Sequence, residues 1–134
     1  MPIATIPLRT TGRCQLIDIT GNVQEAVAQA RASDGFVIVH VPHTTAAVTI
    51  NENADPDVQH DLLAKLAEMI PKSERYYQHA EGNSDAHLKT SLVGNSVTVL
   101  VEAGRLVLGR WQGIYFCEFD GPRQREFMVK FVES

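Results

Sequence analysis

Hydrophobic and polar positions alternate along most of this chain in short runs, which is the pattern of β-strands. Residues 3–8 and 13–19 predict two strands joined by a Thr-Thr-Gly turn. Residues 36–41, Phe-Val-Ile-Val-His-Val, are hydrophobic on both faces, which indicates a central strand covered on both sides. After Pro42, residues 45–53 continue as a further strand.

Helical spacing interrupts this pattern twice in the first half of the chain. The first predicted helix begins at Asn22 and ends before Gly35. The second covers residues 56–70 and has the clearest start, because Asp55 can cap it and Pro56 suits the first helical position. Its apolar residues form a single stripe.

A long polar loop, residues 71–84, precedes a short third helix at about 85–93. Loops of this length in small domains are usually functional. We expect Asp85 to cap this helix, which places His87 in the first turn. Free backbone N–H groups and the helix dipole favour an anion such as phosphate there.

From Gly94 onward the pattern is β to the end, with turns at Gly104 and Gly121. The predicted strands are SVTVLVEAG, RLVLG, QGIYFCEFDG and REFMVKFVE. Many strands with two or three helices predict one α+β domain over residues 1–134, built around a sandwich or barrel-like sheet.

Composition excludes several classes of protein. Hydrophobic residues make up 44% and charged residues 21%, as in globular domains. No apolar stretch approaches the roughly 18 to 20 residues that cross a bilayer, and the N-terminus lacks the layout of a secretion signal. The net charge is −4 and the basic residues are scattered, which argues against nucleic-acid binding. Cys14 and Cys117 have no CxxC spacing and are each flanked by residues of predicted strands, so we expect buried free thiols rather than a disulfide, and a cytoplasmic location.

Three histidines are the main candidates for chemistry. His43 follows a strand and a proline, while His79 and His87 bracket the polar loop, with Asn83 and Asp85 between them. Histidines at such positions can coordinate a metal or move a proton near neutral pH. The alternative is that all three are ordinary surface residues, and spacing alone leaves both interpretations open.

Two polar segments flank these histidines in the predicted fold. Thr44 and Thr45 can bind an anion or cap a turn. Residues 51–55, Asn-Glu-Asn-Ala-Asp, place oxygen ligands at a strand-to-helix junction, which suits Mg²⁺ together with a substrate phosphate. Helix capping explains Asp55 alone, but not the whole segment.

The late strand carries two acidic residues, Glu118 and Asp120, that alternation places on one face. Arg123 and Arg125 follow after a Gly-Pro turn. The arginines can form structural ion pairs with these carboxylates, or they can grip a phosphate.

Three blocks of the sequence resemble a known family. PHTTAAVTINENADPDVQHDL, YQHAEGNSDAHLKTSLVG and SVTVLVEAGRLVLGRWQGIYFCEFDGPRQR are similar to the small YjbQ-like family, which is named for secondary thiamine-phosphate synthase activity. The last block is the most specific, through Ser96, Gly104, Gly109, Trp111 and Gln112. Arg110 departs from the family, which usually carries threonine before the tryptophan.

The resemblance implies a jelly-roll-like β-sandwich of mixed or antiparallel sheets decorated by helices, and a homotrimer. It also implies a site drawn from nine residues: His43, Asn51, Asp55, Asp61, His79, Asn83, His87, Glu118 and Arg123. Our leading hypothesis from the resemblance and the residues together is that a divalent metal, Mg²⁺ or Zn²⁺, is bound there by His43, His79, His87 and Asp55. Catalytic roles are expected for His43, Asp61, Asn83 and Glu118. Substrate contacts are expected from Thr44, Thr45, Asn51, Arg123 and Arg125.

The activity implied by the resemblance joins a hydroxymethylpyrimidine pyrophosphate to a thiazole phosphate and releases pyrophosphate. Expelling pyrophosphate requires positive groups, and the pyrimidine requires a stacking partner, for which Trp111, Tyr76 and Tyr77 are available. Two alternatives remain: a metal-dependent hydrolase of a small phosphate or ester, and a protein that binds a metal or metabolite without catalysis.

Overall fold

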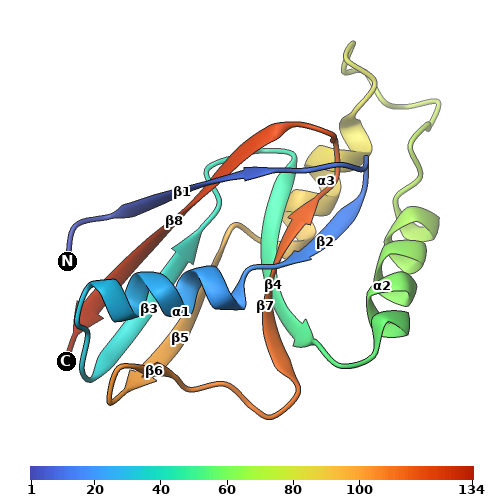
Figure 1. Ribbon diagram of the computed structural model, residues 1–134. Helices are drawn as coiled ribbons and strands as arrows, with labels where there is room; N and C mark the ends of the chain where they lie inside the picture. Colours follow the sequence, from blue (N-terminus) through green and yellow to red (C-terminus); the bar gives the residue numbers. More distant parts are fainter.

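Two antiparallel β-sheets lie face to face in the computed structural model, which describes residues 1–134 (Figure 1). The five-stranded sheet has the order β1-β8-β3-β5-β6 and the three-stranded sheet has the order β2-β7-β4. All strand pairs are antiparallel. The strands are β1 (Ala4–Arg9), β2 (Gln15–Asp18), β3 (Gly35–His40), β4 (Ala46–Glu52), β5 (Ser96–Glu102), β6 (Arg105–Leu106), β7 (Gln112–Glu118) and β8 (Gln124–Glu133).

The main hydrophobic core fills the space between the sheets. Its buried residues come from both sheets and from helix α1 (Thr20–Gln29), which contributes Val23, Ala26 and Val27. Strand β3 lies in the middle of its sheet, as predicted, between β8 and β5. Val37 and Val39 are buried in the core, while Phe36 and Ile38 on the other face remain partly exposed. That outer face is therefore only partly covered, although the sequence indicated burial on both sides.

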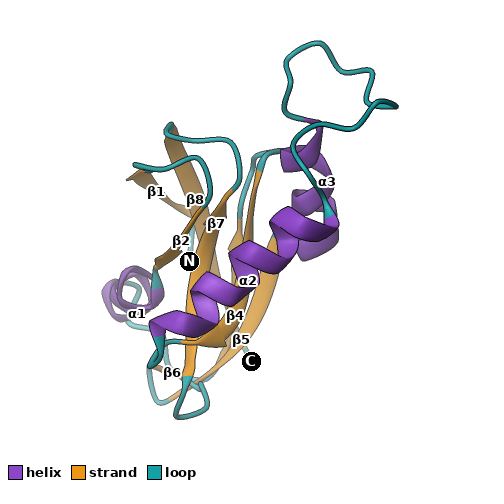
Figure 2. Cartoon of the chain, turned by 90° about the vertical axis from the view of Figure 1, so that its right-hand side faces the viewer, coloured by secondary structure: helices purple, strands orange, loops and turns teal.

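Helices α2 (Pro56–Met69) and α3 (Ser84–Val93) cover the outer face of the three-stranded sheet (Figure 2). A second, smaller hydrophobic cluster joins Ala47 of β4 and Cys117 of β7 to Ala86 of α3, and Leu63 and Leu66 of α2 pack against it. Helix α2 has no buried residue, so it is attached to the body by one partly covered stripe.

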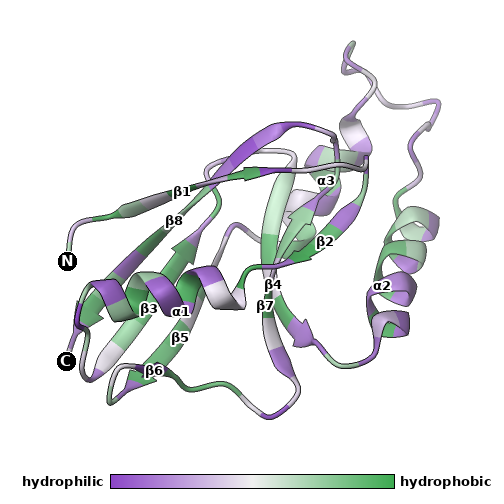
Figure 3. Ribbon diagram, viewed as in Figure 1, coloured by the Kyte–Doolittle hydropathy of each residue, from purple (hydrophilic) through white to green (hydrophobic).

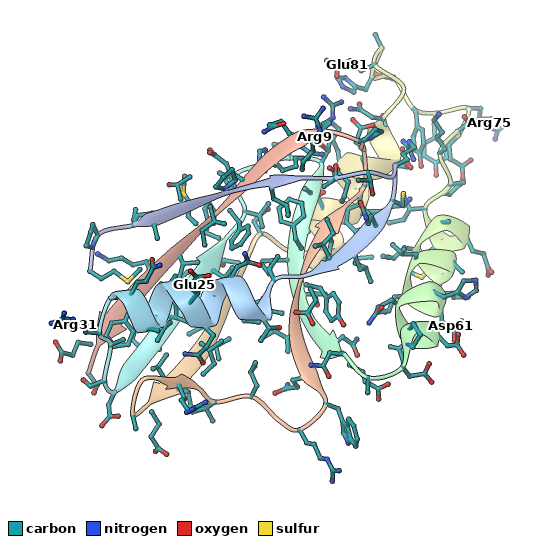
Figure 4. The ribbon with its side chains drawn as sticks, viewed as in Figure 1. Arg9, Glu25, Arg31, Asp61, Arg75 and Glu81 are labelled. Carbon is teal, nitrogen blue, oxygen red and sulfur yellow. The ribbon has the colours of Figure 1, made fainter.

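The segment between α2 and α3 projects beyond the sheets (Figures 1 and 2) and is mostly hydrophilic, whereas β3 is largely hydrophobic (Figure 3). Arg75 and Glu81 mark this projecting loop in Figure 4. No helix of the chain is both long and apolar enough to span a membrane.

The expected α+β sandwich with two or three helices is confirmed, with three helices present, and the structure corrects two local details. Asp85 does not cap α3: the N-cap is Asn83, and the Asp85 side chain is instead buried against two cations. In the predicted strand RLVLG, β6 covers only Arg105 and Leu106. The Val107 N–H still donates to the Leu100 carbonyl at 2.8 Å, and the Gln112 side chain then accepts from the Gly109 N–H in a turn.

Candidate functional site

One end of the sandwich collects most of the predicted site residues. This polar end is formed by residues 43–45, 83–87 and 118–125, where β4 begins, α3 begins and β7 connects to β8. Side-chain contacts join these segments, since Arg125 reaches Thr45 and Asn83 reaches Asp120. Residues far apart in the sequence therefore form one polar cluster.

The centre of this cluster is a buried ion pair between Glu118 and Arg125. The Arg125 Nε atom lies 2.8 Å from Glu118 Oε1, and Arg125 Nη2 donates to Thr45 Oγ1 at 2.8 Å. The Thr10 hydroxyl donates to Glu118 Oε1 at 2.8 Å. Burial raises the pKa of Glu118, but the bonds from Arg125, the Asp120 backbone and Thr10 outweigh it, so the pKa lies below its usual value. The structural ion pair expected as one alternative is present.

A second buried carboxylate, Asp85, is held by two cations. Arg13 donates to both of its oxygens at 3.0 Å, and the Lys89 ammonium lies 3.3 Å from Oδ2. Burial alone raises the pKa of Asp85, but Arg13 and Lys89 together hold it below the ordinary value. This cluster fixes the first turn of α3 to the turn between β1 and β2.

Asp120 connects the polar end to the start of α3. Its Oδ2 accepts from Asn83 Nδ2 at 2.7 Å and from Arg123 Nη2 at 2.8 Å. Asn83 is 5% exposed, and its Oδ1 has no hydrogen-bond partner. Arg123 is half exposed, so unlike Arg125 it remains accessible to a ligand.

Gly121 lets the neighbouring turn approach this cluster closely. Its N–H donates to the Arg13 carbonyl at 3.0 Å. A Cβ atom at this position would lie 2.8 Å from both Glu118 Cγ and Thr10 Oγ1, which is closer than real Cβ contacts. Only glycine fits there without displacing the Glu118 pair.

His43 lies beside the Glu118–Arg125 pair. Its Nε2 is 3.1 Å from both the backbone nitrogen and the carbonyl oxygen of Glu126 on β8. Burial and the nearby Arg125 charge lower the pKa of His43, which favours the neutral ring at pH 7. A neutral imidazole can accept a proton, as a base must.

His79 and His87 lie together at the base of the projecting loop. Their ring centroids are 5.3 Å apart in an edge-on arrangement, and Tyr76 and Tyr77 form a similar pair at 5.4 Å. These four residues line an open pocket of about 510 Å³, together with Gln78, Ser84 and Leu88. We call this the aromatic pocket. Because Ser84 is the first residue of α3, the pocket opens at a helix N-terminus.

Other predicted site residues lie elsewhere. Asp55 accepts from the Asp57 backbone at 2.9 Å and caps α2 at its start, whereas the loop carrying His79 follows the end of this helix. Because the 14 residues of α2 span about 21 Å at 1.5 Å per residue, Asp55 and the loop that carries His79 are connected to opposite ends of a long helix. Asp61 points away from the body (Figure 4), with its side chain 81% exposed.

Asn51 and Trp111 also lie away from the polar end. Asn51 pairs with Gly113 across β4 and β7, close to the end of β4. Trp111 is exposed in the loop before β7, where Arg110 stacks on its ring. Of the three proposed stacking residues, only Tyr76 and Tyr77 line the aromatic pocket.

The four predicted metal ligands do not form one cluster within this chain. No three histidine, cysteine, aspartate or glutamate side chains converge as metal ligands do. Asp55 serves as a helix cap and His43 contacts the β8 backbone, so only His79 and His87 remain close together. A catalytic zinc site needs about three protein ligands, and these residues do not fit one.

Sequence reasoning missed three residues that bind the carboxylates of the polar end: Thr10, Arg13 and Lys89. Arg13 and Asp85 are separated by 72 positions, so no local pattern pairs them. Lys89 had a signal, because it follows Asp85 by four residues on one helix, a spacing that favours ion pairs. The free state predicted for Cys14 and Cys117 is confirmed, but the burial predicted for both holds only for Cys117. Cys14 is partly exposed because β2 begins at Gln15 and leaves Cys14 in the turn before it.

Comparisons with known proteins agree with the resemblance found in the sequence. The family model described as UPF0047 protein YjbQ-like matches residues 4–134. The chain is 51% identical to UPF0047 protein MJ1081 of Methanocaldococcus jannaschii over 93% of this chain and 90% of that protein. It is 48% identical to UPF0047 protein YugU of Bacillus subtilis over 97% and 98% of the two chains.

Solved structures show the same fold. A conserved protein of the YjbQ/UPF0047 family from Clostridium acetobutylicum superposes with a TM-score of 0.94 at 52% identity, covering 96% of this chain and 99% of the other. Protein APE1520 from Aeropyrum pernix gives 0.93 at 35% identity, with both chains fully covered. This chain belongs to the YjbQ-like UPF0047 family.

Proposed function

We propose that this protein is a transferase of the thiamine-phosphate synthase type, which joins a hydroxymethylpyrimidine pyrophosphate to a thiazole phosphate. The observation that supports this best is the aromatic pocket, where Tyr76, Tyr77, His79 and His87 meet the N-terminus of α3. A phosphorylated aromatic ring needs an aromatic side chain to stack on and, next to it, hydrogen-bond donors that bind its phosphate.

The tyrosines supply the ring contact. The Tyr77 hydroxyl donates to the Pro71 carbonyl at 2.8 Å, which anchors the loop. Tyr76 is 68% exposed, so its ring is free to stack on a pyrimidine. Stacked aromatic pairs contribute about 0.5–1.5 kcal/mol beyond the area that they bury.

The start of α3 supplies the phosphate contact. The backbone N–H groups of the first helical residues have no partner within the helix, and the helix dipole adds partial positive charge. His79 and His87 carry N–H groups on the same wall of the pocket. The half-exposed guanidinium of Arg123 is linked to the start of α3 by hydrogen bonds, because Arg123 and Asn83 both donate to the Asp120 carboxylate. These groups can stabilise the charge that develops on departing pyrophosphate.

The reaction involves a divalent cation in this proposal, but no ligand set within the chain is assigned to it. Mg²⁺ usually binds through one or two carboxylates plus substrate phosphates, so pyrophosphate itself can carry the ion into the pocket. The residues of the chain then bind the ring and orient the phosphates. His43, within the polar end, is available as a neutral base.

The assay measures coupled product and released pyrophosphate from the two purified substrates, with and without Mg²⁺ or Zn²⁺. Equal amounts of product and pyrophosphate support the transferase. Release of phosphate or pyrophosphate without coupling contradicts it and favours a hydrolase. Binding in calorimetry with no turnover of either substrate indicates a protein that binds a metabolite without catalysis.

A homotrimer is also proposed, on the strength of the family resemblance. Away from the aromatic pocket the chain exposes several large hydrophobic side chains, among them Met69, Leu92 and Leu100, and burial of such residues is a usual result of assembly.

A further inference from the structure

The two free thiols of the chain have different surroundings. Cys14 is partly exposed in the turn between β1 and β2, whereas Cys117 is 1% exposed in the second hydrophobic cluster. The Lys89 ammonium lies 4.0 Å from Cys14 Sγ, and the Cys14 thiol donates to the Phe119 carbonyl at 3.9 Å. A cation therefore lies next to the more accessible thiol.

Lys89 is an unusual neighbour because it is only 3% exposed. Its carboxylate partner, Asp85, also binds Arg13 through both oxygens. Lys89 and Arg13 thus share the carboxylate of Asp85. The other carboxylate near Arg13 is that of Asp120, at 3.9 Å, and it is already paired with Arg123. A buried cation with incomplete compensation stabilises an additional anionic oxygen beside it.

The spacing between sulfur and nitrogen suits one such oxygen. A charge-assisted N–H···O bond from an ammonium spans about 2.8 Å. Lys89 Nζ already donates to Cys14 Sγ at 4.0 Å, and this distance matches a bent arrangement in which one oxygen is bonded to sulfur and accepts a hydrogen bond from the same nitrogen.

We propose that Cys14 is a site of reversible oxidation by hydrogen peroxide or small alkyl peroxides, and that Lys89 holds the sulfenate formed there. A sulfur lone pair attacks one peroxide oxygen, an S–O bond forms and the O–O bond breaks. Sulfur loses two electrons, and the departing hydroxide, or alkoxide from an alkyl peroxide, takes the thiol proton and leaves as water or an alcohol. The sulfenic acid then releases its proton to solvent, and the anionic oxygen accepts from the Lys89 ammonium. This chemistry is independent of the proposed transfer reaction, because neither residue lines the aromatic pocket.

Cys117 is a matched internal control. Burial raises its pKa from 9.0 to about 12. A shift of this size lowers the thiolate fraction at neutral pH about a thousandfold, and the thiolate is the reactive form. No cation contacts its sulfur, whose hydrogen bond goes to the Tyr115 carbonyl.

The test treats the folded full-length protein with substoichiometric hydrogen peroxide, traps sulfenic acid with a carbon nucleophile, and quantifies each cysteine peptide by mass spectrometry. The expected result is label on Cys14 and almost none on Cys117, with the oxygen adduct removed by a thiol reductant. Equal labelling of both thiols, or none on Cys14, would overturn the proposal.

Two variants separate the role of Lys89 from the exposure of Cys14. Lys89→Met removes the ammonium but leaves Asp85 paired with Arg13, and the yield of sulfenate at Cys14 should fall several-fold. Lys65→Met, which changes an exposed lysine on α2, should leave the yield unchanged. An unchanged yield in folded Lys89→Met protein would contradict the role of Lys89. If that variant does not fold, the comparison of Cys14 with Cys117 in the unmodified protein still decides whether Cys14 is the oxidation site.

Discussion

At the scale of single residues, the polar end depends on buried carboxylates that are each bound by cations. Glu118 and Asp85 are fully buried, and both are surrounded by cations and hydrogen-bond donors. An ion pair between Glu118 and Arg125 could be proposed from the sequence, because the two residues are only seven positions apart and the Gly-Pro turn between them reverses the chain. The pairing of Arg13 with Asp85 could not be predicted, since it depends on how two distant segments pack.

Removing Arg125 should destabilise the protein strongly. Arg125→Met leaves the Glu118 carboxylate buried without its cation, and the loss of one partner of a buried pair costs about 3–5 kcal/mol. Lys65→Met breaks an exposed pair with Glu68 and should change the free energy of unfolding by less than about 1 kcal/mol. Urea denaturation of both variants measures the difference, and equal stabilities would contradict the structural role of the pair.

Acid should destabilise the fold through the same carboxylates. The folded pKa values of Asp85, Asp120 and Glu118 lie below their ordinary values of 3.8, 3.8 and 4.5. The unfolded chain therefore binds more protons as the pH falls through this range, so stability present above about pH 5 is lost below it. Unfolding followed from pH 7 to pH 3 should show this loss. Asp85→Asn should show a shallower loss, and an identical slope would contradict the account.

At the scale of elements, local signals predicted the helices better than the sheets. Asp55, Pro56 and Asp57 lie next to one another and mark the start of α2 directly. The sheet order depends on pairings between distant strands, such as β1 with β8, which no local pattern contains. The N-cap of α3 was misplaced by two residues because Asp85 has the side chain of a good cap, but in the fold that side chain is bound to Arg13 and Lys89.

The role of Asp55 can be tested by keeping its cap and removing its charge. Asp55→Ser retains an oxygen that accepts from the Asp57 N–H, so the free energy of unfolding should change by less than about 0.5 kcal/mol. Asp55→Ala loses the cap and should cost about 1 kcal/mol. Hydrogen exchange in the first turn of α2 should rise only in the alanine variant. A loss of metal-dependent turnover in Asp55→Ser would show that the carboxylate is a ligand as well.

At the scale of the whole molecule, the sandwich sorts the predicted site residues into two groups. His43, Asn83, Glu118 and Arg125 meet at the polar end, close to the His79–His87 pair at the start of α3, while Asn51, Asp55 and Asp61 do not join them. The sequence identified these residues without their arrangement, because a sequence block does not show which strand ends and helix ends lie close together in the fold. The geometry therefore narrows the proposed site to the aromatic pocket and the polar end beside it.

Assembly is a second prediction at this scale. Sedimentation velocity at micromolar concentration should show a single species with three times the mass of the chain. A monomer that persists as the protein concentration rises would contradict the homotrimer.

The most direct test of the proposed site compares turnover in the unmodified protein with that of His79→Ala, His87→Ala and the matched control His60→Ala. His60 is an exposed histidine on α2, outside the aromatic pocket. Synthesis of the coupled product should fall at least about tenfold in both pocket variants, because positioned groups of this kind commonly contribute a factor of about 10² or more to the rate. The control should retain full turnover. Turnover that is unchanged in both pocket variants, with the same dependence on divalent metal, would contradict the assignment of the site.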